Sequence, residues 1–277
     1  QRNQEWREAM PAFLDDVEEK VKIARDHRLK VVIDLHHPPM PGVRADDTEM
    51  WEHPDLEKNF TAFWRAVATR LKPYGDVIWG YDLLNEPLDR NQLPHAPREW
   101  RPLAVKILKA IREIDPDTPI IVACAVGGNP VGFGSLRPID VPNTIYTVHC
   151  YLPHGYTHQG VHGAKMVGAY PGVKHDGRVW NKEMLRRSLE PVVKFQQQYK
   201  VPIYVGEFGA ARWAPGAEQY LADYIDLFEE YGWDWTYHAF REWDGWSAEH
   251  STDPDDKTRY ESTPRMKLLT DYMSRNR

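Results

Sequence analysis

The chain has 277 residues, of which 42% are hydrophobic and 27% charged, and its formal net charge is −6 at pH 7. A single α/β barrel commonly needs about 250 residues, so one large domain fits this length. No run approaches the roughly 20 apolar residues that span a bilayer, and no stretch is strongly basic, which argues against membranes and nucleic acids as partners.

Six short apolar runs alternate with amphipathic segments along the chain. In the amphipathic segments the apolar residues recur at helical spacing and so lie on one face of a helix. The apolar runs end in proline, glycine or polar residues. The predicted strands are residues 31–35, 77–84, 120–125, 144–149, 202–205 and 235–240. The predicted helices are residues 5–27, 56–72, 99–114, 182–199 and 217–231, with a last helix from about residue 264.

This alternation predicts parallel βαβ units. Polar and aromatic residues follow the carboxyl end of each strand, where (β/α)₈ barrel enzymes carry their active sites. A doubly wound nucleotide-binding sheet is the alternative, but Gly127-Gly128-Asn129-Pro130 fits its glycine-rich fingerprint poorly because of the proline. We therefore predict the α/β class and a TIM (β/α)₈ barrel that forms one catalytic domain over residues 1–277.

Two glutamates, Glu86 and Glu207, follow directly after apolar strands. Isolated carboxylates are costly to bury, so two of them at strand ends need an explanation. Hydrolysis of a glycosidic bond uses two carboxyl groups, one that protonates the leaving oxygen and one that attacks the sugar or activates water. Their surroundings must hold them in different protonation states. Ion-paired residues of the barrel rim are the alternative interpretation.

The run Tyr81-Asp82-Leu83-Leu84-Asn85-Glu86-Pro87 resembles the acid/base strand of clan A glycoside hydrolases, and the whole chain from about residue 5 resembles glycoside hydrolase family 5, the cellulase and mannanase family. Asn-Glu-Pro alone is a weak signal. The specificity lies in the order of motifs at successive strand ends, which are Asp34-Leu35-His36, Asn85-Glu86-Pro87, His149-Cys150-Tyr151, Gly206-Glu207-Phe208-Gly209 and Trp243.

The resemblance implies a role for each matching residue. Glu86 would be the acid/base and Glu207 the nucleophile of a retaining mechanism. Asn85 would hydrogen-bond the sugar 2-hydroxyl, a contact that strengthens in the transition state. His36 matches the histidine of the third strand, and Trp243 matches the aromatic platform under the sugar at the cleavage site. A buried structural role is the alternative for the histidine and the tryptophan.

Two further matches concern the surroundings of the glutamates. Tyr151 would donate a hydrogen bond to Glu207 and keep it ionised, and His149 would lie near Glu86. Other aromatic residues crowd into the same loops, and their flat apolar faces suit sugar rings, although most large aromatic residues fill a core. They are Trp213, Trp233, Trp235, Trp246, Tyr156 and Tyr170.

The chain departs from the family at its start. The six readable strands match strands three to eight, and the region of the first two strands is missing. With it goes the family's arginine at the end of strand two, which pairs with the nucleophile. We therefore expect either an N-terminally incomplete copy of the barrel or another element that closes it, since an open barrel would expose strand edges that favour aggregation.

Other functions fit the residues less well. Asp34, His36 and His37 resemble a metal-ligand cluster, but a zinc site needs three ligands on one side, and adjacent residues of an extended chain point different ways. The acidic stretch 253–256 lacks the spacing of a calcium loop and predicts a solvated turn. A carbohydrate-binding protein without catalysis would keep the aromatic residues and need neither glutamate.

The expected function is therefore an endo-acting, retaining β-glycoside hydrolase that needs no metal or cofactor. β-1,4-Glucan is the first substrate choice because it is the family's commonest substrate, and β-mannan is the second. The loop at residues 153–180, with Thr157-His158-Gln159-Gly160, should shape distal subsites. We expect a monomer acting outside the cell or in the periplasm, and two buried cysteines, Cys124 and Cys150, that form neither a disulfide scaffold nor a thiolate metal site.

Overall fold

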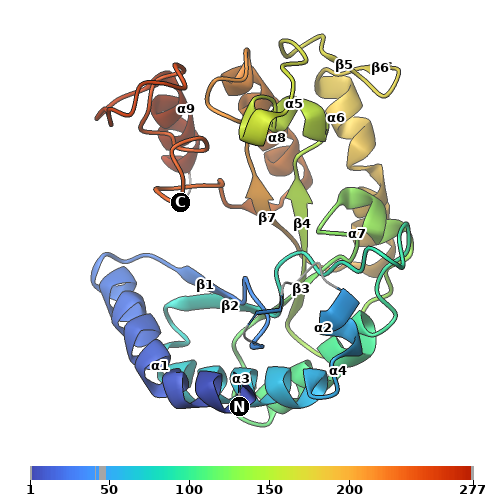
Figure 1. The fold of residues 1–277 in the computed structure, drawn as a ribbon, viewed down its shortest axis with the longest axis vertical. Helices are drawn as coiled ribbons and strands as arrows, with labels where there is room; N and C mark the ends of the chain where they lie inside the picture. The colour runs from blue at the N-terminus through green and yellow to red at the C-terminus, as the bar shows by residue number, and fades with distance from the viewer. Residues whose placement is uncertain (1, 41, 44–47, 276–277) are drawn as a thin grey trace. The chain divides into compact units, whose positions relative to one another are not determined.

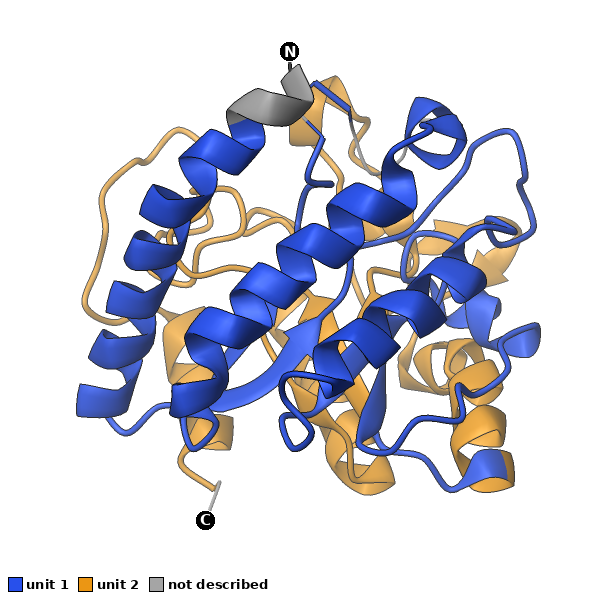
Figure 2. Ribbon diagram, turned by 90° about the horizontal axis from the view of Figure 1, so that it is seen from below, with its two compact units in different colours: residues 1–147, 199–202 blue, residues 148–198, 203–277 orange. Residues whose placement is uncertain are grey.

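The computed structural model of the chain describes residues 2–40, 42–43 and 48–275, with side chains from Trp6 onward. It divides into two compact units, residues 1–147 with 199–202 and residues 148–198 with 203–277 (Figure 2). Among the described residues no helix combines the length and apolar character needed to cross a membrane. The single catalytic domain expected from the sequence stays a prediction.

The first unit consists of parallel strands joined by helices (Figure 1). Its helices are α1 (Arg2–Asp26), α2 (Thr48–Glu52), α3 (Leu56–Leu71), η1 (Lys72–Tyr74), α4 (Trp100–Arg112) and η2 (Pro130–Gly134). Its strands are β1 (Val31–Asp34), β2 (Ile78–Asp82), β3 (Ile120–Ala123) and the first residues of β4 (Thr144–Cys150).

These strands pair in parallel in the order β1-β2-β3-β4, which confirms the predicted βαβ units. In the register Asp34 lies beside Asp82, so β1 and β2 end at the same level. Every residue of β3 is buried and β4 is buried throughout, as expected of strands covered by helices. β1, at the end of the order, is only half-buried.

The helices α1, α3 and α4 lie side by side and cover one face of this sheet (Figures 1 and 2). Three indole N–H groups fasten the helices to the carboxyl ends of β2 and β3 and to the loop after β2. Trp64 on α3 donates to Leu83 O at 3.1 Å, and Trp100 on α4 donates to Ala123 O at 3.0 Å. Trp51 on α2 reaches the oxygen of Leu88 at 2.8 Å. These hydrogen bonds therefore fix the positions of the strand ends from which the functional residues project.

The outer side of β1 carries an apolar groove of about 640 Å³ between the strand and α1. Met10, Phe13 and Val17 line it from the helix and Val32 lines it from the strand. Phe13 is 45% exposed, an unusual state for an aromatic side chain that faces a sheet. The exposed edge expected from the six-strand reading is therefore present at β1, whereas the missing first two strands of a full barrel stay a prediction.

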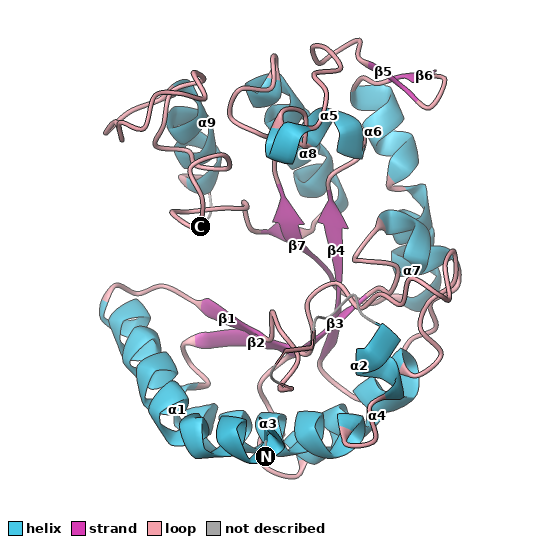
Figure 3. Ribbon diagram, viewed as in Figure 1, coloured by secondary structure: helices cyan, strands magenta, loops and turns pink. Residues whose placement is uncertain are grey.

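The second unit carries the remaining elements (Figures 1 and 3). Its strands follow the order β4-β7-β8, with β7 (Ile203–Phe208) parallel to β8 (Asp234–Trp235). α8 (Ala217–Tyr231) packs on α6, α9 and β8. The other elements are α5 (His154–Thr157), η3 (Val161–Gly163), β5 (Lys174–His175), β6 (Arg178–Val179), α6 (Lys182–Ser188), α7 (Glu190–Tyr199) and α9 (Pro264–Met273).

The structure corrects three predicted elements. The helix predicted over 182–199 is two helices, because Pro191 lacks the N–H that would continue the first one and fits the first turn of the second. The strand predicted over 235–240 pairs only at Asp234–Trp235, although His238 N still donates to Phe208 O. The predicted loop 153–180 contains a hairpin whose turn, Asp176-Gly177, has positive φ at both residues.

Both cysteines are fully buried and neither forms a disulfide, as predicted. Cys124 follows β3, and Cys150 ends β4. Burial raises the pKa of the Cys150 thiol far above its ordinary value, since a thiolate there would be desolvated. Both side chains therefore act as small apolar groups of the core.

Candidate active site

The strand ends of the first unit bring Asp34, His36 and Asn85 together. Backbone hydrogen bonds hold the strand ends, since Leu35 N donates to Asp82 O and Asn85 N donates to Leu35 O. His36 Nδ1 lies 3.0 Å from Asp34 Oδ2, and Asn85 Nδ2 lies 3.5 Å from His36 Nε2. A carboxylate only accepts hydrogen bonds, so Nδ1 carries the proton and Nε2 is the acceptor that faces Asn85.

This hydrogen bond also bears on the alternative metal cluster. His36 Nδ1 and the Asp34 carboxylate are bonded to each other, so these two atoms do not share a metal ion in this arrangement. The acidic stretch 253–256 likewise forms a turn of its own, in which Asp253 accepts from Asp255 N and Asp256 accepts from Thr258 N. The backbone N–H of Thr258, followed by the hydroxyls of Ser251 and Tyr260, holds the pKa of Asp256 well below its usual range.

The backbone at Glu86 adopts an uncommon conformation. Its φ is +45°, in the left-handed region that a side chain with a Cβ rarely occupies and that costs about 1–2 kcal/mol. The next residue is held from the loop after β3, where Val126 N and Gly127 N both donate to Pro87 O. Such outliers persist where the surroundings enforce them and cluster at functional sites. The Asn-Glu-Pro motif therefore has a fixed and strained backbone.

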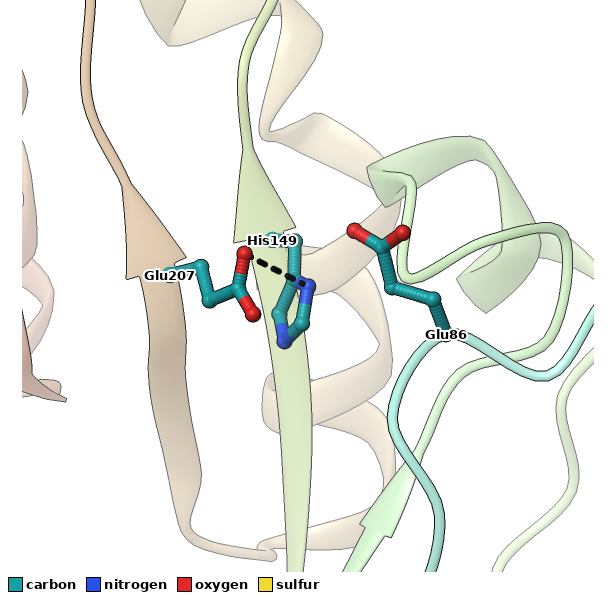
Figure 4. Close-up of side chains that lie close together, drawn as sticks. All are labelled: Glu86, His149 and Glu207. Atoms are coloured by element: carbon teal, nitrogen blue, oxygen red, sulfur yellow. Dashed lines mark ion pairs between the residues drawn. The ribbon is translucent and has the colours of Figure 1, made fainter. Parts of the chain in front are cut away.

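The second unit places two predicted residues around the carboxylate of a third. Glu207 lies near the end of β7, and Tyr151 Oη donates to its Oε2 at 2.8 Å. His149, near the end of β4, is buried, and its Nδ1 lies 3.7 Å from the same oxygen (Figure 4). The side chain of Glu207 is only 16% exposed. The Tyr151 hydroxyl thus donates to a largely buried carboxylate, and the imidazole of His149 lies beside the same oxygen.

The ring of Tyr151 is enclosed by other aromatic side chains. The ring centroid of His158 lies 5.4 Å away, and those of His238 and Trp246 lie 6.2 Å away. His158 in turn stacks on His154 at 3.8 Å. Close packing from several sides holds the phenol in one orientation, so its hydroxyl stays directed at Glu207.

One ring of this cluster gives a prediction on acid stability. Burial first, then the neighbouring His154 and His238, lower the pKa of His158 to about 4. An unfolded chain has a histidine pKa of about 6.5, so between pH 6.5 and 4 it binds a proton that the folded ring does not. The free energy of unfolding should fall through this window as pH decreases, by about 2 kcal/mol from this group, since residual solvent exposure reduces the full effect.

Urea unfolding at pH 7 and at pH 4.5 measures this loss, with a smaller pH dependence expected for His158→Gln than for the unchanged protein. His95→Gln is the matched control, because His95 is exposed and lies in the loop between β2 and α4. An equal loss of stability in the His158→Gln variant and the unchanged protein would contradict the prediction.

Trp243 lies among aromatic rings of the loops that follow β7 and β8. Trp213 and Trp246 meet it edge-on, with centroids 5.9 and 5.7 Å away. His162, in the η3 turn, lies nearly parallel to it at 6.1 Å. Trp213 is itself anchored by a 2.7 Å hydrogen bond from its indole N–H to Gln159 O. The loop predicted to shape subsites therefore reaches the predicted sugar platform.

The predicted site residues thus gather in two groups, one in each unit. His36 and Asn85 lie together in the first unit, and Tyr151, His149 and Glu207 lie together in the second. Trp243 is linked to Tyr151 through Trp246. The distance between Glu86 and Glu207, and the shared cleft of all seven residues, join the two units and stay predictions.

Several neighbours in the second unit did not stand out in the sequence. His158, His162 and His238 lie in loops without a readable motif, and only their contacts distinguish them. In the opposite direction, two of the noted tryptophans are structural. Trp233 donates to Gln196 and Trp235 donates to Glu229, on the helix side of the sheet.

Comparison with known proteins gives consistent matches. Residues 2–247 match the family profile described as cellulase (glycosyl hydrolase family 5). Endoglucanase C of Acetivibrio thermocellus is 31% identical over 245 residues, which covers 77% of this chain and 69% of that protein. Cellodextrinase A of Ruminococcus flavefaciens is 22% identical over 197 residues, with 70% of this chain and 56% of that protein covered.

Solved structures agree on the fold. A hyperthermophilic endo-β-1,4-glucanase in complex with substrate is 27% identical, with a TM-score of 0.74 over 95% of this chain and 78% of that one. Thermotoga maritima Cel5A in complex with mannotriose is 26% identical, with a TM-score of 0.74 over 94% and 78% of the two chains. A mutant form of the same enzyme with cellobiose gives a TM-score of 0.76 at 26% identity, over 93% and 77%.

Parallel βα units with carboxyl side chains at the strand ends, together with these matches, define a glycosidase of the TIM-barrel class. The chain belongs to glycosyl hydrolase family 5.

Proposed function

We propose that the protein is a retaining endo-β-1,4-glucanase, with Glu207 as the nucleophile and Glu86 as the acid/base. The observation that carries this proposal is the 2.8 Å hydrogen bond from Tyr151 to Glu207, a largely buried carboxylate near the end of β7. A nucleophile must be ionised and correctly aimed, and a hydrogen-bond donor on a carboxylate oxygen favours the ionised form.

The reaction proceeds in two displacements. In the first, Glu207 attacks the anomeric carbon, the glycosidic C–O bond breaks, and Glu86 donates its proton to the leaving oxygen. In the second, Glu86 takes a proton from water, whose oxygen attacks the same carbon and releases Glu207. Each displacement inverts the anomeric centre, so the product keeps the β configuration.

Asn85, with His36 and Asp34 behind it, and Trp243 bind the sugar in this scheme. Asn85 hydrogen-bonds the 2-hydroxyl, and His36 restricts the orientation of the amide through its Nε2. Asp34 fixes the histidine in the tautomer that this contact needs. Trp243 provides the apolar face under the sugar ring, which C–H groups of a pyranose contact favourably.

Substrate class is tested by a hydrolysis screen. The related endo-β-1,4-glucanases favour β-1,4-glucan as the first substrate. β-Mannan is the second candidate, because Thermotoga maritima Cel5A has been solved with mannotriose as well as cellobiose. Carboxymethyl cellulose, mannan and mixed-linkage glucan should be compared at equal reducing-end concentration.

Proton NMR of the first product should show the β-anomer before mutarotation, and an α-anomer would contradict retention. Release of no sugar from any of these glycans would instead favour binding without catalysis.

Geometry gives a second check on the mechanism. Retaining enzymes hold the two carboxyl groups about 5–5.5 Å apart, whereas inverting enzymes leave about 6.5–9.5 Å for a water molecule. We expect a crystal structure of this protein to place the carboxyl groups of Glu86 and Glu207 at the shorter separation. The longer separation would overturn the double-displacement scheme.

Removal of the Tyr151 hydroxyl should weaken the nucleophile without removing it. Tyr151→Phe keeps the ring among His158, His238 and Trp246 and deletes only the donor to Glu207. A hydrogen bond to a charged group contributes about 1.5–3 kcal/mol, so kcat should fall about 10–100-fold. Tyr156→Phe is the matched control, since Tyr156 donates to Pro215 O away from the carboxylate. Steady-state kinetics measure both variants. If Tyr151→Phe kept the same kcat as Tyr156→Phe, the hydrogen bond from Tyr151 would have no part in activating Glu207.

The expected setting of this reaction is extracellular or periplasmic, because a glucan polymer does not enter the cytoplasm. We propose that the protein acts there as a monomer with the polysaccharide as its partner. Size-exclusion chromatography with light scattering tests the oligomeric state.

A further inference from the structure

A buried arginine lies in the loop between β7 and α8, five residues beyond Glu207 along the chain. Arg212 is only 1% exposed. An arginine cannot lose its charge in a protein, so its burial is costly unless every donor finds an acceptor. The hydrogen-bond acceptors of Arg212 therefore show which segment of the chain its buried guanidinium stabilises.

Nearly all of these acceptors belong to the loop that follows β8. The guanidinium Nε donates to Asp244 O at 2.9 Å. One terminal nitrogen donates to the carbonyl oxygens of Ser251 and Asp253. The other donates to Pro254 O at 3.1 Å and Asp256 O at 3.0 Å. One side chain thus fastens both ends of the segment 244–256, which contains turns and one isolated β-bridge residue but no helix or strand.

The carboxylate of Asp244 completes this network. Its Oδ2 lies 2.7 Å from Lys257 Nζ and 3.2 Å from Arg212 Nη2. These two cations, Lys257 first, hold the pKa of Asp244 below its ordinary value. One oxygen of the Asp244 carboxylate therefore binds two cationic side chains of the protein, and these bonds stabilise the loop.

The backbone of Arg212 adds a contact directly under Trp243. Arg212 N donates to Gly245 O at 2.9 Å, so Arg212 binds two successive carbonyl oxygens, those of Asp244 and Gly245. A Cβ built on Gly245 would lie 2.2 Å from the ring of Trp243, so the indole lies directly on the glycine. Cation packing extends to the next residue, with the guanidinium carbon 5.6 Å from the ring centroid of Trp213.

We propose that Arg212 is a positioning residue that seats the Trp243 ring under the sugar by fixing the backbone at Asp244 and Gly245. The inference rests on the proposed role of Trp243 as the sugar platform. Arg212 lies in the loop after β7, the strand that carries Glu207, and it binds the loop that carries Trp243. The same buried side chain therefore supports both parts of the site in the second unit. Lysine cannot replace it, because its single ammonium group cannot span carbonyl groups on both sides of the loop.

The test is a double-mutant cycle with Arg212→Lys and Trp243→Ala on cello-oligosaccharides. A small displacement of a binding group can reduce the rate about 10²-fold, so Arg212→Lys should lower kcat/KM about 10–100-fold. In the Trp243→Ala background the same change should alter kcat/KM by less than about twofold, because the platform is already absent. Its effect on Tm should be equal in both backgrounds. A purely structural arginine would lower kcat/KM by the same factor in both backgrounds, and that result would overturn the proposal.

The outcomes separate this inference from the proposed function. If Trp243→Ala alone leaves kcat/KM unchanged, the platform role fails and this inference fails with it. If Trp243→Ala is strongly impaired and Arg212→Lys is not, only the inference fails. Arg265→Lys is the matched control, since Arg265 is also buried and donates to Ala210 O and Tyr237 Oη instead of the loop. Any effect of that change should be the same in both backgrounds.

A second variant tests the seat itself and remains informative if Arg212→Lys does not fold. Gly245→Ala places a methyl group where the Trp243 ring now lies and leaves every contact of the guanidinium intact. It should lower kcat/KM about as much as Arg212→Lys, with a Tm closer to that of the unchanged protein. Unchanged kcat/KM in Gly245→Ala would show that the seat of the ring does not matter and would overturn the proposal.

Discussion

Replacement of Glu207 by glutamine is expected to reduce turnover on every glycan and every activated aryl glycoside by at least about 10⁴-fold, the scale on which loss of a nucleophile acts. The amide cannot form the glycosyl-enzyme, whatever the leaving group. Glutamine keeps the shape of the side chain and can still accept the hydrogen bond that Tyr151 donates at 2.8 Å. The loss therefore reports the missing charge and nucleophile, and the packing of the site is preserved.

Single-turnover assays and mass spectrometry of the trapped enzyme measure this result. Glu261→Gln is a suitable control, because Glu261 is exposed in the segment before α9. It should keep the activity of the unchanged protein. A covalent glycosyl adduct on the Glu207→Gln variant would show that another group is the nucleophile, and the assignment of both glutamates would then have to be exchanged.

The alternation of apolar runs and amphipathic segments was sufficient to predict the parallel strands and their order. Burial on both faces makes β3 uniformly apolar and leaves β2 and β4 rich in aromatic and β-branched residues, so these strands are visible without an alignment. The last strand was overestimated because Trp235 and its neighbours have high strand propensity, whereas pairing depends on a neighbouring backbone. The Asp176-Gly177 turn was a readable hairpin signal that the sequence interpretation did not use.

For the site, the sequence predicted residues at successive strand ends, and the structure brings them together in two groups, one in each unit. Asn85 and His36 came from motifs at neighbouring strand ends, so their contact follows from parallel geometry. The roles of His158 and Arg212 could not be predicted in the same way. Both act through loop residues distant in sequence, and loop conformation depends on tertiary contacts that carry no periodic pattern.

The second large effect concerns Glu86, and its size should depend on the leaving group. Glu86→Ala should slow hydrolysis of natural glycans by about 10²–10⁴-fold, because the sugar hydroxyl that departs needs a proton. The phenolate of an aryl glycoside with an acidic phenol can leave without being protonated. Formation of the glycosyl-enzyme on Glu207 should therefore stay close to the normal rate with such substrates. Its breakdown still needs a base for water, so the intermediate should accumulate and give a burst of phenol.

Stopped-flow release of a nitrophenol measures the burst, and steady-state rates on cello-oligosaccharides measure the loss on natural substrates. The pH profile supplies an independent readout. A general acid acts in its protonated form, so deprotonation produces the alkaline limb of the rate profile, and that limb should disappear in the Glu86→Ala variant. Glu99→Ala, a glutamate of the same unit that precedes α4, should keep the limb and lack the burst. If Glu86→Ala slowed aryl glycosides and natural glycans by the same factor, protonation of the leaving oxygen would not be the role of Glu86.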